Sequence, residues 1–359
     1  MTSKEFLYNY LNAYSPVAQE WEGQKIWADY IKPFVGEVHS DNYGTVYGVI
    51  KSKIQDENEL NGKPRYKVAI EAHADEISFM ITHIDKDGLV YVCRHGGSDA
   101  SIAPSKSVVI HTRKNGTIRG VFGFTAIHLR KGEEKAPKPE DLWIDLGLLS
   151  EEEVKKAGVE VGNIVTFEEK FSELGNFYCG KSLDNKIGGY IISEVTKKIK
   201  DNNISLPYDL YIINSVQEEV GLFGSLLIAN QIKPDVAIVH DVCHSTDTPN
   251  ISKIKNSNIM SGKGPTLEYA PQNHRLLIDF IRDTAESNNI EYQLEPGSQG
   301  NDTMSFFKAG CVTAIIASPL RYMHTTCEMI HKDDVNSVID LFYQCLVDLN
   351  CRSWKYYDF

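Results

Sequence analysis

Two adjacent carboxylates, Glu218 and Glu219, follow an apolar segment at 211–216 and precede Gly221. Neighbouring carboxylates resist joint ionisation because like charges at short range repel each other. A cation bound beside them would stabilise the pair, which therefore indicates a metal site at the end of a strand. A solvated first turn of a helix is the plain alternative, since the helix dipole favours acidic side chains there.

Other residues of metal-ligand type also lie at or just after the carboxyl end of an apolar segment. They are His73 and Asp75 after 68–72, Asp241 after 236–239, and His324 after 312–318. In open α/β sheets, binding and catalytic groups gather outside the carboxyl ends of the strands. We therefore expect these distant segments to direct their polar side chains to one place.

His73 and Asp75 are two residues apart, so on a strand they share one face. An aspartate in this position orients the imidazole, whose other nitrogen can then bind a metal. A buried histidine that is simply hydrogen-bonded to a neighbouring acid has the same pattern. The pair alone leaves both interpretations open.

A helix is predicted to begin near Asp184, with Ser182 as its N-cap. Gly188 and Gly189 fall inside this helix, where each glycine costs about 1 kcal/mol relative to alanine. We expect close packing of another segment against the helix to explain them.

Asp241 lies between His240 and His244, with Cys243 beside it. A local zinc site built from these residues is disfavoured, because structural zinc sites use spaced pairs of ligands. Asp241 alone is the better candidate. Cys243 and Cys327 are expected to be small buried residues rather than ligands.

Two histidines and three carboxylates suit a pair of catalytic divalent metals that share one carboxylate. Such a pair lowers the pKa of bound water, and a carboxylate that is not a ligand accepts the proton. Of Glu218 and Glu219, one would then bind metal and the other act as base. A glycoside hydrolase would also need two carboxylates, but not the histidines. A non-catalytic metal-binding scaffold is the other alternative.

The segments that carry these residues alternate between strand-like and helix-like patterns. Strands are predicted at 68–72, 211–216, 236–239 and 312–317, and helices from about 184, from about 224, across 274–287 and from about 333. This alternation is typical of an α/β fold, in which crossover helices cover a sheet.

Residues 78–171 have a different pattern, with short β-type segments joined by turn dipeptides. The dipeptides at 87–88 and 115–116 are Asp-Gly and Asn-Gly, which favour β-hairpins. We therefore predict a β-rich domain at 78–171 that is inserted into a discontinuous α/β domain at 1–77 and 172–359.

Composition narrows the class of protein further. The chain has 359 residues, of which 42% are hydrophobic, and this length suggests about two domains. The net charge of −12 argues against a nucleic-acid partner. The seven cysteines include no Cys-x-x-Cys pair, as expected for reduced thiols in the cytoplasm. No signal-peptide pattern or long apolar run is present, so no membrane role is expected.

Together these motifs resemble the tetrahedral aminopeptidases, cytosolic dinuclear metallopeptidases that also carry the names glutamyl aminopeptidase and endoglucanase. The resemblance covers almost the whole chain and is carried by AHADEI (72–77), IDLG (144–147), VGNIV (161–165), LDNKIGG (183–189), QEEVGL (217–222), DVCHSTDTP (241–249), GKGP (262–265) and PLRYMH (319–324). It implies an α/β fold, with a mixed-sheet metallopeptidase domain sandwiched by helices and an inserted small β-barrel-like domain.

The resemblance also implies a role for each candidate residue. The ligands of two divalent metals would be His73 and Asp241 in one site, Glu219 and His324 in the other, and Asp184 bridging both. Zinc is the first expectation, with cobalt or manganese as alternatives. Glu218 would be the general base that activates a metal-bridging water, and Asp75 would orient His73.

The implied activity is removal of N-terminal residues from short peptides, in a homo-oligomer that is commonly a twelve-subunit tetrahedron. Two segments depart from the family pattern, 15–20 and 298–306, although Asp302 keeps an acid in the second. The preferred N-terminal residue stays open. Lys263 and Arg321 are candidates to bind an acidic side chain, with ordinary ion pairing as the alternative.

Overall fold

The structure is a computed structural model that describes residues 1–53, 65–130, 135–297 and 300–357. Within these residues, eleven strands form one mixed sheet in the order β1-β2-β12-β3-β13-β16-β17-β11-β10, with β14 paired to β16 and β15 to β14. The strand bounds are β1 Glu37–Ser40, β2 Val46–Ile50, β3 Lys67–His73, β10 Ser172–Leu174, β11 Phe177–Gly180, β12 Asp209–Ser215, β13 Val236–His244, β14 Thr266–Tyr269, β15 Gln293–Pro296, β16 Val312–Arg321 and β17 Glu328–His331.

The four central strands, β12, β3, β13 and β16, are parallel. The strands outside them pair antiparallel, except β15, which is parallel to β14. The four strands predicted from the sequence lie in this parallel core. The helices around the sheet are α1 Ser3–Asn12, α2 Trp21–Ile31, α4 Leu183–Asp201, α5 Phe223–Ile232, α6 Lys253–Asn256, α7 Arg275–Ser287, α8 Thr303–Lys308 and α9 Lys332–Asp348. The predicted helices correspond to α4, α5, α7 and α9.

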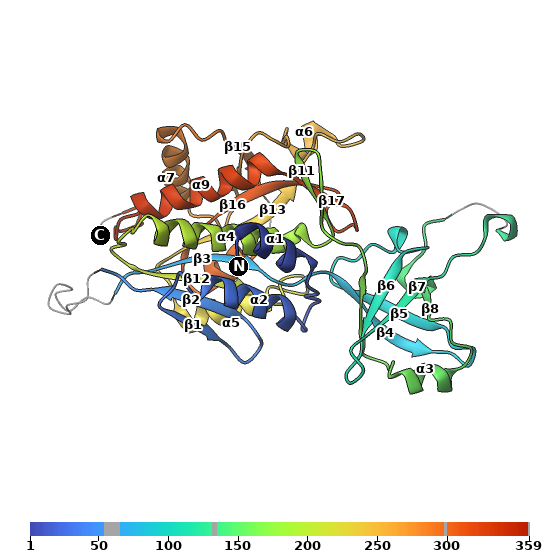
Figure 1. Ribbon diagram of the computed structural model, residues 1–359. Coiled ribbons are helices and arrows are strands. Elements are labelled where there is room, and N and C mark those ends of the chain that lie inside the picture. Colours follow the sequence, from blue (N-terminus) through green and yellow to red (C-terminus); the bar gives the residue numbers. More distant parts are fainter. Residues whose placement is uncertain (54–64, 131–134, 298–299, 358–359) are drawn as a thin grey trace.

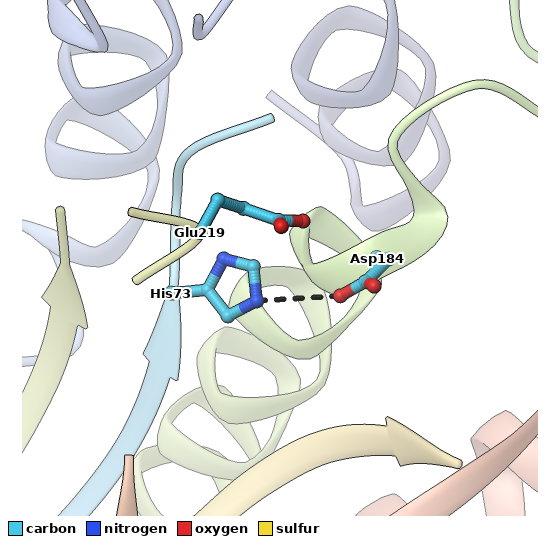
Figure 2. Close-up of side chains that lie close together, drawn as sticks. All are labelled: His73, Asp184 and Glu219. Carbon is cyan, nitrogen blue, oxygen red and sulfur yellow. Dashed lines mark ion pairs between the residues drawn. The ribbon is translucent and has the colours of Figure 1, made fainter. Parts of the chain in front are cut away.

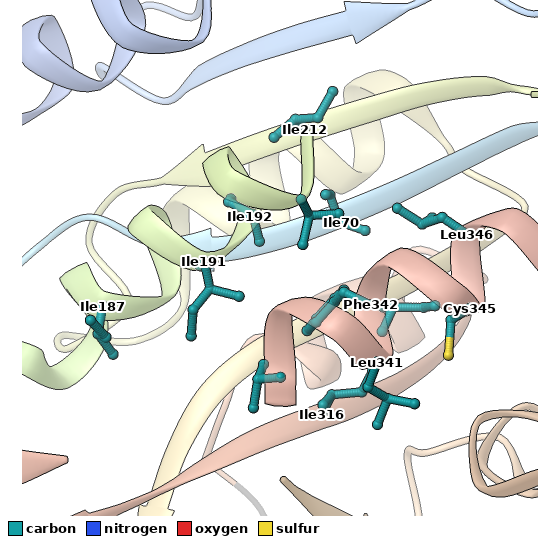
Figure 3. Close-up of a cluster of buried hydrophobic side chains, with 14 of the residues drawn as sticks. Ile70, Ile187, Ile191, Ile192, Ile212, Ile316, Leu341, Phe342, Cys345 and Leu346 are labelled. Carbon is teal, nitrogen blue, oxygen red and sulfur yellow. The ribbon is translucent and has the colours of Figure 1, made fainter. Parts of the chain in front are cut away.

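Successive strand residues point to opposite faces of the sheet, and each face has its own core. On one face, Ile70 and Ile212 pack with residues of α1, α4 and α9. On the other face, Ala69 and Ile213 pack with residues of α5 and α8. Figure 3 shows α4 and α9 contributing buried side chains to the core beside the central strands. The sheet is thus sandwiched by helices, as expected.

Gly188 and Gly189 lie where α4 packs most closely. A Cβ on Gly188 would be 2.4 Å from Nδ1 of His240 and 2.9 Å from Cβ of Ala72, and one on Gly189 would be 2.6 Å from Oη of Tyr10. The prediction that these glycines permit close packing is confirmed.

The remaining strands form a separate closed barrel, seen to the right in Figure 1. Its order is β4-β5-β8-β7-β6-β9, with bounds β4 Ser78–Ile84, β5 Val90–His95, β6 Ser107–His111, β7 Thr117–Phe122, β8 Trp143–Asp145 and β9 Ile164–Phe167. The rings of Phe79, Phe122 and Phe167 meet in its core, and α3 Glu151–Ala157 also belongs to this region. The predicted β-barrel-like insertion is confirmed, whereas the domain boundaries at 77/78 and 171/172 stay a prediction.

Among the residues that the structure describes, no helix is both long and apolar enough to span a bilayer.

Candidate metal centre

The candidate ligands meet at the edge where the parallel strands end. His73 ends β3, Asp241 lies near the end of β13, Glu218 and Glu219 follow β12, His324 follows β16, and Asp184 lies at the start of α4. Because adjacent parallel strands end at the same edge of the sheet, their following residues converge there. All six side chains line one cavity of about 550 Å³.

Asp184 lies between the two histidines. Its Oδ1 atom is 3.3 Å from Nε2 of His73, and its Oδ2 atom is 3.1 Å from Nε2 of His324. Asp241 Oδ1 lies 3.9 Å from the same nitrogen of His73, and Glu219 Oε1 lies 3.2 Å from the same nitrogen of His324. The donor atoms therefore form two groups that share Asp184.

Figure 2 shows His73, Asp184 and Glu219 converging from three different segments. One ligand atom from each of these residues lies within 4.8 Å of the others. This spacing allows the three side chains to contact a common ion.

Asp75 lies behind the cluster and is fully buried. Its Oδ1 atom is 3.4 Å from Nδ1 of His73, an ion-pair contact without hydrogen-bond geometry. The same carboxylate accepts the backbone N–H groups of Glu218, at 3.0 Å, and Glu219, at 3.1 Å. Asp75 thus fixes the backbone of both glutamates relative to His73.

Burial raises the pKa of Glu218 and Asp241 well above the usual carboxyl range, and neighbouring carboxylates add to this effect. Burial also raises the pKa of Glu219, against the opposing effect of His324. Each of these shifts shows that the anionic form lacks sufficient positive charge nearby.

The pKa values of the two histidines are raised as well, which favours their charged form. Burial alone would lower the pKa of His73, but its contacts with Asp184 and Asp75 raise it well above the ordinary imidazole value. Burial likewise opposes a charged His324, yet its contacts with Asp184 and Glu219 raise its pKa to about 11. The carboxylates thus stabilise the protonated, positively charged form of both histidines.

This donor set fits divalent metal ions. In the described part of the chain, the ion pairs of the cluster involve only histidines, with no lysine or arginine. Imidazole nitrogens and carboxylate oxygens are ligands of catalytic zinc and related ions. Bound cations would supply the missing positive charge and displace the protons that the free cluster retains.

Glu328 is a buried residue of the site that the sequence patterns did not reveal. Its two carboxylate oxygens accept the backbone N–H of His324, at 2.7 Å, and that of Asp184, at 3.2 Å. It thereby connects the backbones of two candidate ligands. No motif or spacing signals this residue, because its role depends on the pairing of β17 with β16.

The two cysteines singled out in the sequence behave differently. Cys243 is partly buried and lines the cavity, whereas Cys327 is exposed. The expectation of burial is therefore wrong for Cys327, because the turn between β16 and β17 leaves its side chain at the surface. Neither belongs to the group of ligand atoms found around Asp184.

Lys263 and Arg321 do not line the cavity. Lys263 Nζ lies 3.3 Å from Glu291 on the surface, and Arg321 forms two hydrogen bonds with Asp247, at 2.9 and 2.6 Å. Ordinary ion pairing therefore accounts for both cations.

Both segments that depart from the family pattern take part in buried hydrogen bonds. Asp302 is buried and accepts hydrogen bonds from Ser215, at 3.2 Å, and from Ser225. The backbone N–H of Ser15 donates to buried Glu76 at 2.9 Å. Positions 298 and 299 lie outside the described residues.

A mixed α/β sheet, an inserted barrel and a cluster of imidazoles and carboxylates at the strand ends define a hydrolase of the metallopeptidase type. A model of the family described as M42 glutamyl aminopeptidase matches residues 57–341, and the chain belongs to this family. It is therefore an aminopeptidase, a hydrolase of peptide bonds.

Individual relatives agree with this assignment. The lysyl aminopeptidase of Pyrococcus furiosus is 30% identical over 330 residues, which cover 89% of this chain and 90% of the relative. A TET aminopeptidase from a marine sediment thaumarchaeon has a TM-score of 0.90 at 28% identity, with 97% of each chain covered. The TET1 peptidase of Pyrococcus horikoshii, which can assemble into a tetrahedron or a large octahedral shell, has a TM-score of 0.82 at 25% identity, with coverage of 97% of this chain and 100% of that chain. The predicted family, fold class and enzyme class are confirmed.

Proposed function

We propose that this aminopeptidase uses two divalent metal ions to remove N-terminal residues from short peptides. The ligands would be His73 and Asp241 for one ion, Glu219 and His324 for the other, and Asp184 for both. The observation that carries this proposal is the position of Asp184, whose two oxygens face different histidines. A structural site for a single ion would not need that arrangement.

Metal ions held there would polarise the scissile carbonyl group and lower the pKa of a nearby water molecule. Zinc is the first expectation, because imidazole and carboxylate ligands suit it, and cobalt or manganese are the alternatives.

Glu218 is assigned as the general base. Its carboxylate lines the cavity, and its Oε2 atom lies 3.9 Å from Nε2 of His73. The side chain is therefore beside the cluster. From there it would accept the proton of the attacking water and pass it to the leaving amine.

Asp75 and Glu328 are assigned as positioning residues. Asp75 holds His73 and the backbone of the two glutamates, and Glu328 holds the backbone of Asp184 and His324. Fixed ligands keep the geometry of the site constant when substrate binds.

The relatives support a homo-oligomer. The Pyrococcus horikoshii peptidase can assemble into a tetrahedron or a large octahedral shell, and we propose a similar assembly here, a dodecamer in the first instance. Active sites inside such a shell would admit only short peptides. Light scattering that gave the mass of a single chain would contradict this part of the proposal.

All seven cysteines are free, which supports a cytoplasmic location.

The names of the relatives do not fix the preferred N-terminal residue. The description of the family names a glutamyl aminopeptidase, whereas the Pyrococcus furiosus relative is a lysyl aminopeptidase. The side chains of glutamate and lysine carry opposite charges. The substrate preference of this chain must therefore follow from its own cavity.

The central test is the substitution Glu218→Gln, which keeps the size of the side chain and removes its basicity. We expect full metal content by elemental analysis and a fall in kcat for leucine p-nitroanilide of about 10² to 10⁴. The matched variant Glu219→Gln alters a proposed ligand, so it should lose metal as well as activity. Near-normal turnover by the Glu218 variant would remove the assignment of the base.

A further inference from the structure

A second acidic pair lies in the cavity that contains the candidate metal centre. Glu268 in β14 and Glu295 in β15 both line this cavity. The two strands are parallel, and their register places Glu268 directly opposite Glu295. Opposed residues on neighbouring strands share one face of the sheet, so the two carboxylates face the same space.

No cation neutralises this pair among the residues that the structure describes. Glu268 Oε2 accepts hydrogen bonds from the side-chain amides of Asn273, at 3.1 Å, and Asn301, at 3.2 Å, and the thiol of Cys243 faces Glu295. The described lining of the cavity contains no lysine or arginine. Positions 298 and 299, outside the described residues, are Ser and Gln and carry no charge.

The pair is also partly buried. Burial raises the pKa of Glu295 to about 7, and the charge of Glu268 adds to the effect. Burial raises the pKa of Glu268 as well. Two carboxylates that repel each other in a partly buried cavity would be stabilised by an incoming cation.

The distance from the metal centre suits one side chain of a substrate. Asp241 and Cys243 are two residues apart in β13, so at about 3.3 Å per residue they are separated by about 7 Å along the strand. Glu295 interacts with Cys243, the residue of β13 two positions beyond the candidate ligand Asp241. A lysine side chain, with its four-carbon stem, spans a comparable distance.

The lining of the cavity also includes apolar side chains. Val242, Ile315 and Ala317 line this cavity together with the acidic residues. Lysine and arginine bury their methylene stems along apolar surfaces while their charged ends reach polar groups. The cavity therefore combines a surface for methylenes with carboxylates for a cationic end.

We propose that Glu268 and Glu295 select peptides whose N-terminal residue is lysine or arginine. This inference rests on the proposed function, because the metal centre must hold the scissile bond for the side chain of the first residue to reach the pair. The chief rival is that the pair binds the free α-amino group, which every unblocked peptide carries. The two possibilities predict different substrate profiles.

The first experiment uses the metal-loaded wild-type enzyme and two matched substrates. Norleucine p-nitroanilide has the four-carbon side chain of lysine p-nitroanilide but lacks its ammonium group. We expect kcat/KM to be at least about tenfold higher for the lysine substrate, the effect of one charged hydrogen bond. A ratio near one, or a preference for leucine or glutamate anilides, would overturn the inference while leaving the proposed function intact.

The second experiment uses Glu295→Gln and Glu268→Gln. Each should lower the lysine-to-norleucine ratio of kcat/KM by about tenfold, because the amide keeps the shape and removes the charge. The control Glu291→Gln removes an exposed carboxylate that pairs with Lys263 outside the cavity, so it should leave the ratio unchanged.

The outcomes separate the alternatives. An equal loss for both substrates in the Glu295 and Glu268 variants would assign the pair to the α-amino group and overturn the inference. Hydrolysis of no aminoacyl anilide by the wild-type enzyme would overturn the proposed function and this inference with it.

Discussion

Asp184 is the residue on which the metal centre depends most, because each of its oxygens faces a different histidine. Asp184→Asn removes the negative charge shared by both proposed sites, and we expect metal content to fall from two ions to less than one per chain. The control Asp201→Asn alters an exposed carboxylate at the other end of α4 and should retain both ions. Elemental analysis of the purified variants measures the difference, and an Asp184 variant with full metal content would contradict the bridging role.

Glu295 gives substrate selection a dependence on pH. Its pKa is raised to about 7 by burial and by Glu268, and the group that faces it from β13 is the thiol of Cys243. Below this pKa the carboxyl group is protonated and attracts a cation less, whereas the lysine ammonium stays charged throughout this range.

The lysine-to-norleucine ratio of kcat/KM should therefore fall as the pH decreases from 8 to 6. Because kcat/KM reports the pKa values of the free enzyme, the midpoint of this fall should lie near pH 7. The Glu295→Gln variant should have a flatter profile. An unchanged wild-type ratio across this range would contradict the prediction.

The individual residues differ in how far the sequence could identify them. Glu218 and Glu219 could be found because two adjacent acids after an apolar segment are unusual without a cation. Glu268, Glu295 and Glu328 lie in short strands with no recognisable pattern. Their positions depend on the register of β14 with β15 and of β17 with β16, which only the folded sheet supplies.

At the level of the elements, helix α4 positions Asp184 through its unusually close contact with the sheet and with α1. The start of this helix and the role of its glycines could be predicted locally. Ser182 lies at the expected N-cap position but makes no capping hydrogen bond, because its hydroxyl donates to Glu76 instead. Closure of the barrel could not be predicted locally, because it requires β9 to pair with both β4 and β6, which are distant in sequence. Short-range patterns indicate hairpins but not which strands close a barrel.

The close packing of α4 predicts that one glycine-to-alanine substitution in this helix destabilises the protein, which is the opposite of the usual effect. Replacing glycine by alanine in an exposed part of a helix stabilises it by about 1 kcal/mol. In Gly189→Ala, however, the new Cβ would lie 2.6 Å from Oη of Tyr10. We expect overpacking to lower the free energy of unfolding by about 1 to 3 kcal/mol.

Thermal unfolding measures this effect as a lower midpoint. Lys200→Ala, on the exposed side of the same helix, should change the midpoint little. A more stable Gly189 variant would show that α4 can move away from Tyr10, and that its packing does not fix the start of the helix.

In the whole molecule, the two cores on either side of the sheet and the core of the barrel consist of apolar residues. None of the candidate metal ligands belongs to these cores. The chain should therefore remain folded when metal is removed, although with a lower thermal midpoint, because ions that bind only the native state stabilise it.

Chelation consequently distinguishes the three functions that the sequence left open. For a dinuclear aminopeptidase, a chelator should abolish hydrolysis of aminoacyl anilides and lower the thermal midpoint by several degrees, and added zinc should restore both. A glycoside hydrolase would cleave a β-glucan with or without the chelator, because its two carboxyl groups need no metal. A scaffold would show the change in thermal midpoint without hydrolysis of any unblocked peptide. Added zinc that restored both activity and stability, with no cleavage of the glucan, would agree with the paired ligands around Asp184. Hydrolysis that survived complete metal removal would contradict the metal centre itself.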